Sequence, residues 1–531
     1  MSDRLREARL DLSRRHLLRC FGAGAFAALA LPLARPALAD PVFRTVPFQL
    51  GVASGEPAAD GFVIWTRLAP EPFEIGHGMP AQAIEVQWEV AEDDSFRAIA
   101  RSGTAVARPE LGHSVHVEVD GLAPSRPYWY RFTAGRERSF AGRAVTAPLP
   151  GARTDRLRFA VAGCQNYEQG YYTAHRRLAA EELDFVFCYG DYIYEGRGNR
   201  LRNTAEGPVE TIRQHFGAEI YSLEDYRRRY AQYKMDPDLQ AAHAAAPWFS
   251  VWDDHEIDNN WVDFTDQDGT PPAIFALRRQ AAMQAFYENM PLRASALPVG
   301  PSMQLFRRAE WGDLVNLNLL DTRQYRTDQP CGDRWMIECA EVSRREAEVL
   351  GERQHDWLMQ GITQSPALWS VLAQQVMVMD LDRDPGPGTA YNLDSWAGYR
   401  TPRERLLRGL KDQRAQNVVV LTGDEHQNYA GELHLDGRNP GSEPIGIEFV
   451  TTSISSGGDG QDQRPDMVAI QAANEQLKFN NNQRGYGVFE VDRERFQAEF
   501  KVIDRVATRD GTLSTRKRLA VPAGEPRLFE A

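Results

Sequence analysis

From about residue 157 onward, short apolar runs alternate with stretches of helical periodicity. Strands that alternate with helices pack into layers of sheet and helix. The sequence therefore predicts an α/β domain over residues 150–531, with a β-sheet core flanked by helices. The predicted strands are 157–164, 183–191, 248–254, 314–321, 369–379 and 417–424, and the predicted helices are 223–245, 274–290, 343–362 and 402–413.

The preceding segment, from residue 43 to about 149, has a different pattern. Four runs at 61–68, 84–92, 113–122 and 127–135 alternate apolar and polar residues, with Gly, Pro and Asp between them. This period and spacing are typical of a β-sandwich. We expect a small all-β domain of fibronectin or immunoglobulin type over residues 40–149. No acids cluster with His or Cys there, so we assign it no chemistry.

The first 39 residues resemble an export signal. Arg14 and Arg15 precede an apolar stretch from about residue 21 to 33, and Ala37-Leu38-Ala39 supplies small residues for cleavage. A membrane anchor is the alternative, but the apolar stretch is too short to span a bilayer. The arginine pair predicts the twin-arginine export route. We expect a periplasmic or secreted protein that begins near Asp40.

The net charge argues against two classes of partner. Residues 1–39 contribute +4 (seven arginines against three acids) to the net charge of −13, so the rest of the chain carries −17. An acidic surface disfavours nucleic acid and anionic membranes. If the substrate is anionic, positive charge must be supplied locally.

The cysteines predict one disulfide. Cys331 and Cys339 flank a loop-like segment and are a plausible pair in an oxidising compartment. Cys188 lies inside an apolar run and is expected in the core. Cys164 is then an odd thiol, which needs another explanation.

Five segments with polar side chains begin where predicted strands end. In α/β sheets, sites form at the carboxyl ends of strands, so we expect these segments to meet at one sheet edge. The segments are Cys164, Gly190-Asp191, Asp253-Asp254-His255-Glu256, Asp321-Thr322-Arg323 and Gly423-Asp424-Glu425-His426.

Such a convergence of acids predicts a site for several metal ions. Carboxylates that meet without lysine partners repel one another unless cations lie between them. Each carboxylate alone could instead be a helix cap or a turn residue. His255 could bind metal, donate a proton or bind phosphate, and the residues leave this open. The candidate ligands are Asp191, Asp254, Asp424 and His426, with His255, Glu256, Asn259 and Asn260 as further possibilities.

Several motifs together resemble the PhoD-like alkaline phosphatases. They are "VAGCQNYEQGYYTAHRRL", "YGDYIYEG", "WDDHEIDNNW", "LDTRQYR", "NLDSWAGYRTPRERLL" and "LTGDEHQNYAGEL", with "FQLGVASGEPAADGFVIWTRLAP" in the amino-terminal segment. Relative to the broader metallophosphoesterase pattern, the chain keeps Gly190-Asp191 and a variant Gly423-Asp424-x-His426. It departs at Cys164 and at residues 253–256, and both departures match the PhoD-like branch.

The resemblance implies an exported, metal-dependent phosphoesterase that hydrolyses phosphate monoesters and also diesters. It implies attack on phosphorus by a metal-bound oxide or hydroxide. It implies ferric iron (Fe³⁺) bound by Cys164 and Tyr194 with Asp191 nearby, and calcium (Ca²⁺) completing the cluster. Tyr194 is preferred to Tyr192 because it matches the family position, and a buried hydrogen-bonded phenol is the alternative.

The implied site includes acids, amides and two catalytic candidates. Asp254, Asn259, Asn260, Asp424 and His426 are the further metal ligands. His255 and Arg323 are the catalytic candidates. Arg323 is a possible phosphate clamp, and a structural ion pair is the alternative.

The expected partners are phosphate-ester small molecules and the twin-arginine export machinery, and the expected state is a monomer. Two other functions remain open. The preferred substrate could be a phosphodiester, including a phospholipid cleaved in the manner of phospholipase D. The chain could also be an inactive extracellular binding protein whose metals are structural.

Overall fold

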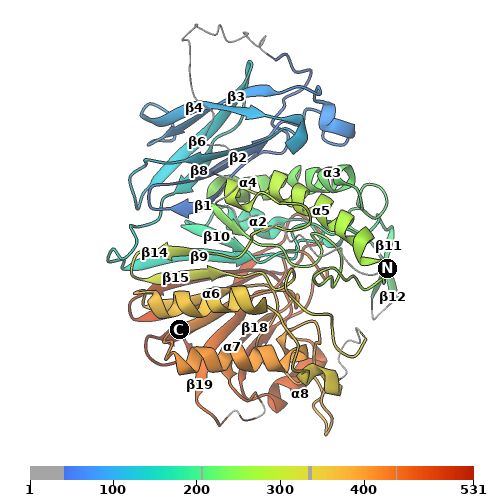
Figure 1. Cartoon of the computed structure of the whole chain (residues 1–531), viewed down its shortest axis with the longest axis vertical. Coiled ribbons are helices and arrows are strands. Elements are labelled where there is room, and N and C mark those ends of the chain that lie inside the picture. Colours follow the sequence, from blue (N-terminus) through green and yellow to red (C-terminus); the bar gives the residue numbers. More distant parts are fainter. Residues whose placement is uncertain (1–40, 205–206, 333–337, 438, 440) are drawn as a thin grey trace, which may run out of the picture. The chain divides into compact units, whose positions relative to one another are not determined.

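The computed structural model describes residues 41–204, 207–332, 338–437, 439 and 441–531 (Figure 1). The predicted signal peptide, residues 1–39, lies outside the described residues. Residues 40–531 form one compact unit, and the domain boundary near residue 149 stays a prediction. Within the described ranges, no helix has the length and apolar character needed to cross a membrane.

A ten-stranded sheet has three parallel strands at its centre, and a fourth parallel strand pairs with the last of them. Parallel neighbours place their carboxyl ends at the same sheet edge, so the residues that follow them become neighbours. The central strands are β9 (Arg156–Ala162), β10 (Phe185–Cys188) and β13 (Trp248–Ser250). Beyond β9 lie β21 (Arg484–Asp492), β22 (Arg495–Ile503), β23 (Leu513–Pro522) and β24 (Phe529–Glu530). Beyond β13 lie β1 (Val52–Ala58), β2 (Gly61–Arg67) and β5 (Ser114–Val119).

The amino-terminal segment is built of strands and two short 3₁₀ helices, η1 (Ile75–Gly78) and η2 (Pro109–Leu111). A five-stranded sheet contains β3 (Ile84–Ala91), β4 (Ile99–Ala107), β6 (Pro127–Ala134), β7 (Glu137–Arg138) and β8 (Gly142–Val145). Phe62 and Ile64 of β2 share a core with Val86, Tyr130 and Phe132 of this sheet. The all-β prediction for this segment therefore agrees with its observed elements.

The amino-terminal strands are hydrogen-bonded into the central sheet through β1 and β13, which pair in parallel at Gly55 and Trp248. A Cβ atom at Gly55 would lie 2.6 Å from the Trp248 carbonyl oxygen. Any other residue would therefore push the two strands apart.

A second, seven-stranded sheet has the order β14-β15-β16-β17-β19-β18-β20. Strands β15, β16, β17 and β19 are parallel, and the others are antiparallel to their neighbours. The sequence predicts a single sheet edge, and the structure corrects this to the edges of two sheets. Bounds are β14 (Arg307–Trp311), β15 (Val315–Leu319), β16 (Trp369–Ala373), β17 (Val418–Thr422), β18 (Asn428–His434), β19 (Pro444–Val450) and β20 (Leu477–Asn481).

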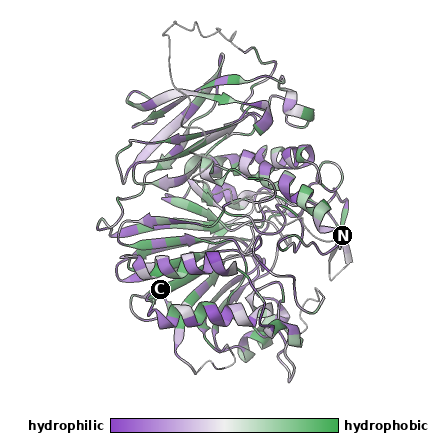
Figure 2. Cartoon of the chain, in the orientation of Figure 1, coloured by the Kyte–Doolittle hydropathy of each residue, from purple (hydrophilic) through white to green (hydrophobic). Residues whose placement is uncertain are grey.

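Aromatic side chains join the two sheets in one core. The Phe159 ring stacks on Phe489 with centroids 5.3 Å apart, and Phe449 and Phe496 pack in the same cluster. Figure 2 shows hydrophobic residues along the central strands and mixed residues on the helices. Burying these aromatic rings between the sheets contributes a large apolar area to this core.

Helices cover the outer faces of both central sheets (Figure 1). Leu406 and Leu410 of α7 pack with Val418 and Val420 of β17, whereas Val419 faces the core between the sheets. Because both faces of β17 are buried, its run is continuously apolar. The helices are α2 (Thr173–Leu178), α3 (Leu223–Lys234), α4 (Pro237–Ala245), α5 (Pro272–Asn289), α6 (Gly351–Gln364), α7 (Arg400–Asp412) and α8 (Pro465–Ala473).

Two predicted helices differ from the observed ones. The predicted helix 223–245 is divided into α3 and α4, because Asp236 caps α4 by accepting the N–H groups of Asp238 and Leu239 and Pro237 occupies its first position. The helix predicted from residue 343 begins at Gly351, after the 3₁₀ helix Ala340–Ser343.

Cys331 and Cys339 form a disulfide, which confirms the predicted pair. Closing so short a loop stabilises the fold by about 2.5 kcal/mol in the chain-entropy model.

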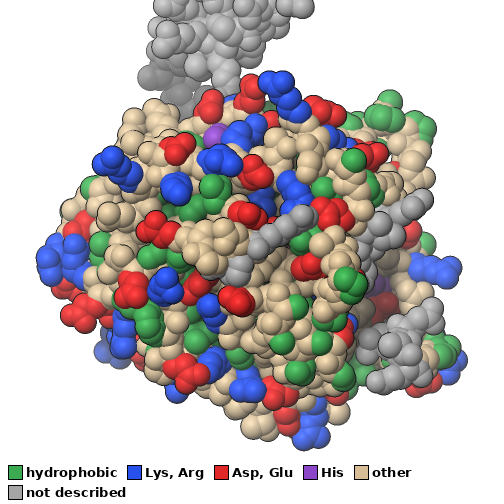
Figure 3. All heavy atoms as spheres, turned by 90° about the horizontal axis from the view of Figure 1, so that it is seen from below, with side chains coloured by type: hydrophobic (Ala, Val, Ile, Leu, Met, Phe, Trp, Pro, Cys, Tyr) green, Lys and Arg blue, Asp and Glu red, His purple; other side chains and the backbone are tan. Residues whose placement is uncertain are grey.

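On the face drawn in Figure 3, acidic and basic side chains are interspersed, with no extended patch of one sign.

Candidate metal centre

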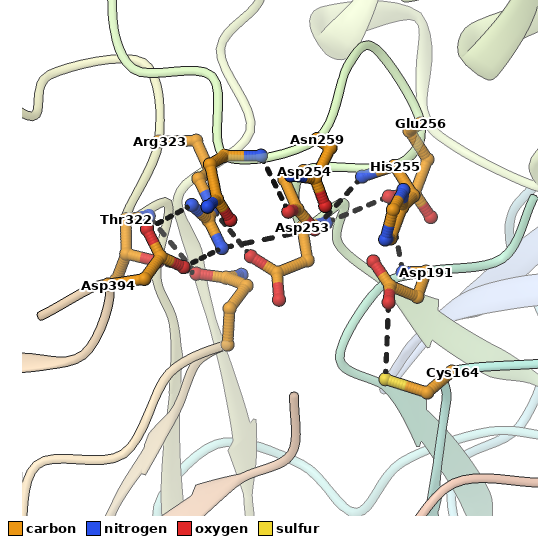
Figure 4. A network of polar contacts seen from close by, with 12 residues as sticks. Cys164, Asp191, Asp253, Asp254, His255, Glu256, Asn259, Thr322, Arg323 and Asp394 are labelled. Atoms are coloured by element: carbon orange, nitrogen blue, oxygen red, sulfur yellow. Dashed lines mark hydrogen bonds and ion pairs between the residues drawn. The ribbon is translucent and has the colours of Figure 1, made fainter. Parts of the chain in front are cut away.

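The predicted site residues converge where the carboxyl ends of the two central sheets meet (Figure 4). Cys164, Asp191 and Asp254 follow β9, β10 and β13, while Asp424 follows β17. Three groups of side chains could each hold a metal ion, because within each group the possible ligand atoms all lie within 4.8 Å of one another. The groups are Cys164, Asp191 and His426; Asp191, Asp254 and His255; and Asp253, Asp254 and Asp424.

Left-handed backbone turns direct these side chains inward. The φ angles are 50° at Cys164, 53° at Asp191, 54° at Asn260, 65° at Asp424 and 53° at His426. Such conformations cost about 1 kcal/mol or more at non-glycine residues and persist only where the surroundings impose them. Strain at five predicted site positions supports a functional role for the cluster.

Asp191 is the centre of the first group. Its Oδ2 accepts hydrogen bonds from the Tyr194 hydroxyl at 2.7 Å and from the Cys164 thiol at 3.4 Å. The Tyr194 oxygen also lies 3.4 Å from His426 Nε2 and 2.7 Å from Ser456 Oγ. The structure thus brings together the three residues expected around the ferric ion, and it adds His426 and Ser456.

Glu256 is a buried clasp between two of the site loops. Its carboxylate accepts the backbone N–H groups of Asp191 at 3.2 Å, Tyr192 at 2.6 Å and Asp253 at 2.9 Å. The sequence pattern indicates Glu256 as a possible metal ligand. Because both oxygens are committed to backbone amides, the geometry favours a structural role instead.

The two asparagines lie beside Asp254. The backbone N–H of Asn260 donates to Asp254 Oδ2 at 2.8 Å, and the Asn259 side-chain amide donates to Gln267 at 2.9 Å. Figure 4 places Asn259 next to Asp254. Metal binding by either asparagine stays a prediction.

His255 is held by a carboxylate that sequence analysis missed. Glu195 Oε2 lies 2.7 Å from His255 Nδ1, and Glu195 Oε1 accepts the Asn259 backbone N–H at 2.9 Å. The His255 ring packs on the Tyr194 ring with centroids 4.1 Å apart. Burial alone would lower the pKa of His255, but Glu195 and Asp254 raise it well above its usual value.

Arg323 is fully buried in ion pairs. Its Nε donates to Asp253 at 2.6 Å, and its two terminal nitrogens donate to the Asp394 carboxylate at 3.0 and 2.8 Å. These contacts occupy the guanidinium, so they favour the structural ion pair over the phosphate clamp. Asp394 lies inside the motif "NLDSWAG", but nothing in that run indicates a charge partner.

The carboxylates carry more negative charge than Arg323 offsets. Burial, followed by the charges of Asp253 and Asp394, raises the pKa of Asp424 well above its usual range. Burial likewise raises the pKa of Asp191, and Asp254 adds to this shift. In both cases burial and neighbouring carboxylates disfavour the ionised form.

Metal ions fit this environment. Asp191 Oδ1 and Asp253 Oδ2 are buried and have no hydrogen-bond partner among the described residues. Burial and the nearby Asp191 charge raise the pKa values of Cys164 and Tyr194, so both groups need a cation beside them to ionise. Phenolate and carboxylate oxygens suit a hard trivalent or divalent cation, and a thiolate ligand is compatible with iron.

Replacing Arg323 with methionine tests its structural role. We expect Arg323→Met to lower the free energy of unfolding by about 3–5 kcal/mol, because it leaves buried carboxylates unpaired. Unfolding by a chemical denaturant in the absence of substrate measures this free energy. The control is Arg408→Met, whose exposed pair with Glu404 should be worth about 0–1 kcal/mol. Unchanged stability with a raised KM would instead establish the phosphate clamp.

Comparisons with known proteins cover nearly the whole described chain. The family model described as PhoD-like phosphatase matches residues 159–500, and that of the PhoD-like phosphatase N-terminal domain matches residues 34–148. Alkaline phosphatase D from Bacillus subtilis (strain 168) is 46% identical over 503 residues, which cover 93% of this chain and 85% of that protein.

A solved structure of PhoD is also similar. It shares 45% identity and a TM-score of 0.90, and the match covers 92% of this chain and 93% of that one. Identity at this level over 92% of the chain goes beyond a shared fold. The chain belongs to the PhoD-like phosphatase family.

Proposed function

We propose that this protein is a metal-dependent phosphoesterase that hydrolyses phosphate monoesters, and diesters as further substrates. The observation that carries the proposal is the cluster of buried thiol, phenol and carboxylate groups with half-buried imidazoles in a chain of this family. Its similarity to a named alkaline phosphatase D supports the same activity. The chain is accordingly an alkaline phosphatase of PhoD type.

The residues of the cluster divide between two kinds of cation. Anionic sulfur and oxygen ligands favour ferric iron, whereas calcium takes six to eight oxygens. Cys164, Asp191, Tyr194 and His426 would hold Fe³⁺, and Asp254, Asp424 and the amide oxygens of Asn259 or Asn260 would supply Ca²⁺ ligands. Bound cations supply positive charge that attracts phosphate and Lewis acidity toward its oxygens.

His255 is the residue placed to handle a proton. Because Nδ1 is held by Glu195, Nε2 remains to donate to a phosphoryl or leaving-group oxygen. Arg323 acts through the aspartates that it pairs with, by fixing Asp253 at the edge of the cluster.

Finer descriptions of the fold belong to the same proposal. Two packed sheets with helices on their outer faces support a metallophosphoesterase-like catalytic domain over residues 150–531. The two layers of the amino-terminal segment support a fibronectin- or immunoglobulin-like sandwich over residues 40–149.

Two other functions are separated by assays. A phosphodiesterase or phospholipase D-type enzyme would prefer the bis ester of p-nitrophenol, or a phospholipid, to p-nitrophenyl phosphate. An inactive binding protein with structural metals would hydrolyse none of these after metal loading.

The activity itself is tested on the purified protein with p-nitrophenyl phosphate. Wild type should hydrolyse it, whereas Asp424→Asn and His426→Ala should lower kcat/KM by more than about 100-fold, since even residues beside ligands typically matter 10- to 100-fold. Asp466→Asn, an exposed carboxylate on α8, is the control and should keep wild-type rates. Activity that survives in both site variants would place the ligands elsewhere.

The iron assignment predicts a coloured protein. Thiolate and phenolate both donate charge to ferric iron on absorbing visible light. Calcium and zinc ions cannot produce such an absorption band. Tyr194→Phe and Cys164→Ser should each weaken or shift the band, and reduction with dithionite should bleach it. Visible spectra and metal analysis measure this. An active wild type that is colourless and free of iron would exclude the iron site.

We also propose that the chain is exported by the twin-arginine machinery and works as a monomer in the periplasm or outside the cell. The arginine pair and the small residues before Asp40 support the export route. Replacing Arg14 and Arg15 with lysines should leave unprocessed precursor inside the cell, as measured by immunoblotting of cell fractions. Normal processing of that variant would contradict the route.

A further inference from the structure

The loop after β19 enters the metal centre through Ser456, which is buried. Its backbone is fixed on two sides. Its carbonyl oxygen accepts hydrogen bonds at 2.6 Å from Arg484 Nη1 and from the Ser453 hydroxyl. Its N–H donates to the Cys164 carbonyl oxygen at 3.2 Å. The hydroxyl of Ser456 is therefore presented to the site by a rigid support.

Three groups meet at this hydroxyl. Ser456 Oγ lies 2.7 Å from the Tyr194 oxygen and 2.7 Å from the Cys164 carbonyl oxygen, and it accepts the Asn166 backbone N–H at 3.0 Å. One hydroxyl thus touches the side chain of one candidate iron ligand and the backbone of another. Those two ligands follow different strands, so Ser456 fixes their relative position.

These contacts have two states, which differ in where the hydroxyl protons lie. A hydroxyl has one proton. While Tyr194 is a neutral phenol, it donates to Asp191 or Ser456, and Ser456 donates to the Cys164 carbonyl. When Tyr194 is a phenolate, it has no proton to give and can only accept one.

The Cys164 carbonyl can release the hydroxyl at low cost. It also accepts backbone N–H groups from Ser455 at 3.4 Å and Ser456 at 3.2 Å. If the Ser456 proton turns toward Tyr194, this carbonyl remains hydrogen-bonded. No buried backbone acceptor is left without a partner, which would otherwise be the main penalty of the change.

We infer that Ser456 is a positioning residue of the metal centre. Its hydroxyl holds the Tyr194 oxygen against the Cys164 backbone, and it is the donor placed beside that oxygen when Tyr194 binds iron. The inference rests on the proposed iron site. Hydrogen bonds beside metal ligands tune both affinity and electronic properties, and a donor to the phenolate lowers its tendency to give charge to iron.

The test compares Ser456→Ala with Ser455→Ala in the iron-loaded full-length protein. Ser455 is a matched control because its hydroxyl donates to the Asn166 carbonyl oxygen at 2.8 Å. Loss of the donor should move the visible band of Ser456→Ala to longer wavelength. It should also lower iron affinity about 10- to 100-fold in competition with a chelator. Ser455→Ala should match wild type in both measurements.

A measurement on wild type does not depend on how the variants fold. The tyrosinate vibrations in resonance Raman spectra should shift between H₂O and D₂O, because the hydrogen bonded to the phenolate exchanges. A coloured wild type without this shift would overturn the role of Ser456. Identical visible bands in wild type and Ser456→Ala would also overturn it. So would visible bands that are shifted equally in Ser456→Ala and Ser455→Ala. A colourless wild type without iron would instead overturn the proposed metal site.

Discussion

Carboxylates repel one another at the junction of the two sheets. Asp191, Asp253, Asp254 and Asp424 meet in a region where burial already disfavours charge. Arg323 offsets part of it and cations can offset the remainder. Loops on both sheets must hold these groups against their mutual repulsion. That requirement accounts for the Glu256 clasp and for the left-handed turns that follow the strands.

Much of the site could be predicted because strand ends are visible in sequence. A polar residue directly after an apolar run must lie at a sheet edge, and this placed Cys164, Asp191, Asp254 and Asp424 correctly near one another. The division into two sheets could not be predicted, because alternation gives the strands but not which strands pair. Roles within the cluster were also beyond reach. Glu256 is committed to backbone amides of residues up to 65 positions away, and residue type alone gives no sign of such a partner.

The contact of Ser456 with the site is not visible in the sequence. The segment "TTSISSGGDG" contains Ser456, but serine and glycine in that pattern indicate only a turn. Its importance follows from a contact with Tyr194, 262 residues earlier in the chain. The four strands β21–β24 were not assigned from the sequence either, although β21 lies directly beside the strand that precedes Cys164.

Because β21 pairs with β9, one side of β9 is completed only late in synthesis. Strand β9 is flanked by β10 on one side and by β21 on the other, and Arg158 and Glu490 at their pairing are 332 residues apart. At about 5–20 residues per second, the ribosome delivers β21 roughly 17 to 66 s after β9. During this interval one edge of β9 has no partner, and the turn that holds Cys164 has no finished sheet beside it. The site is thus among the last parts of the molecule that can form, and any ion captured before then would meet an incomplete set of ligands.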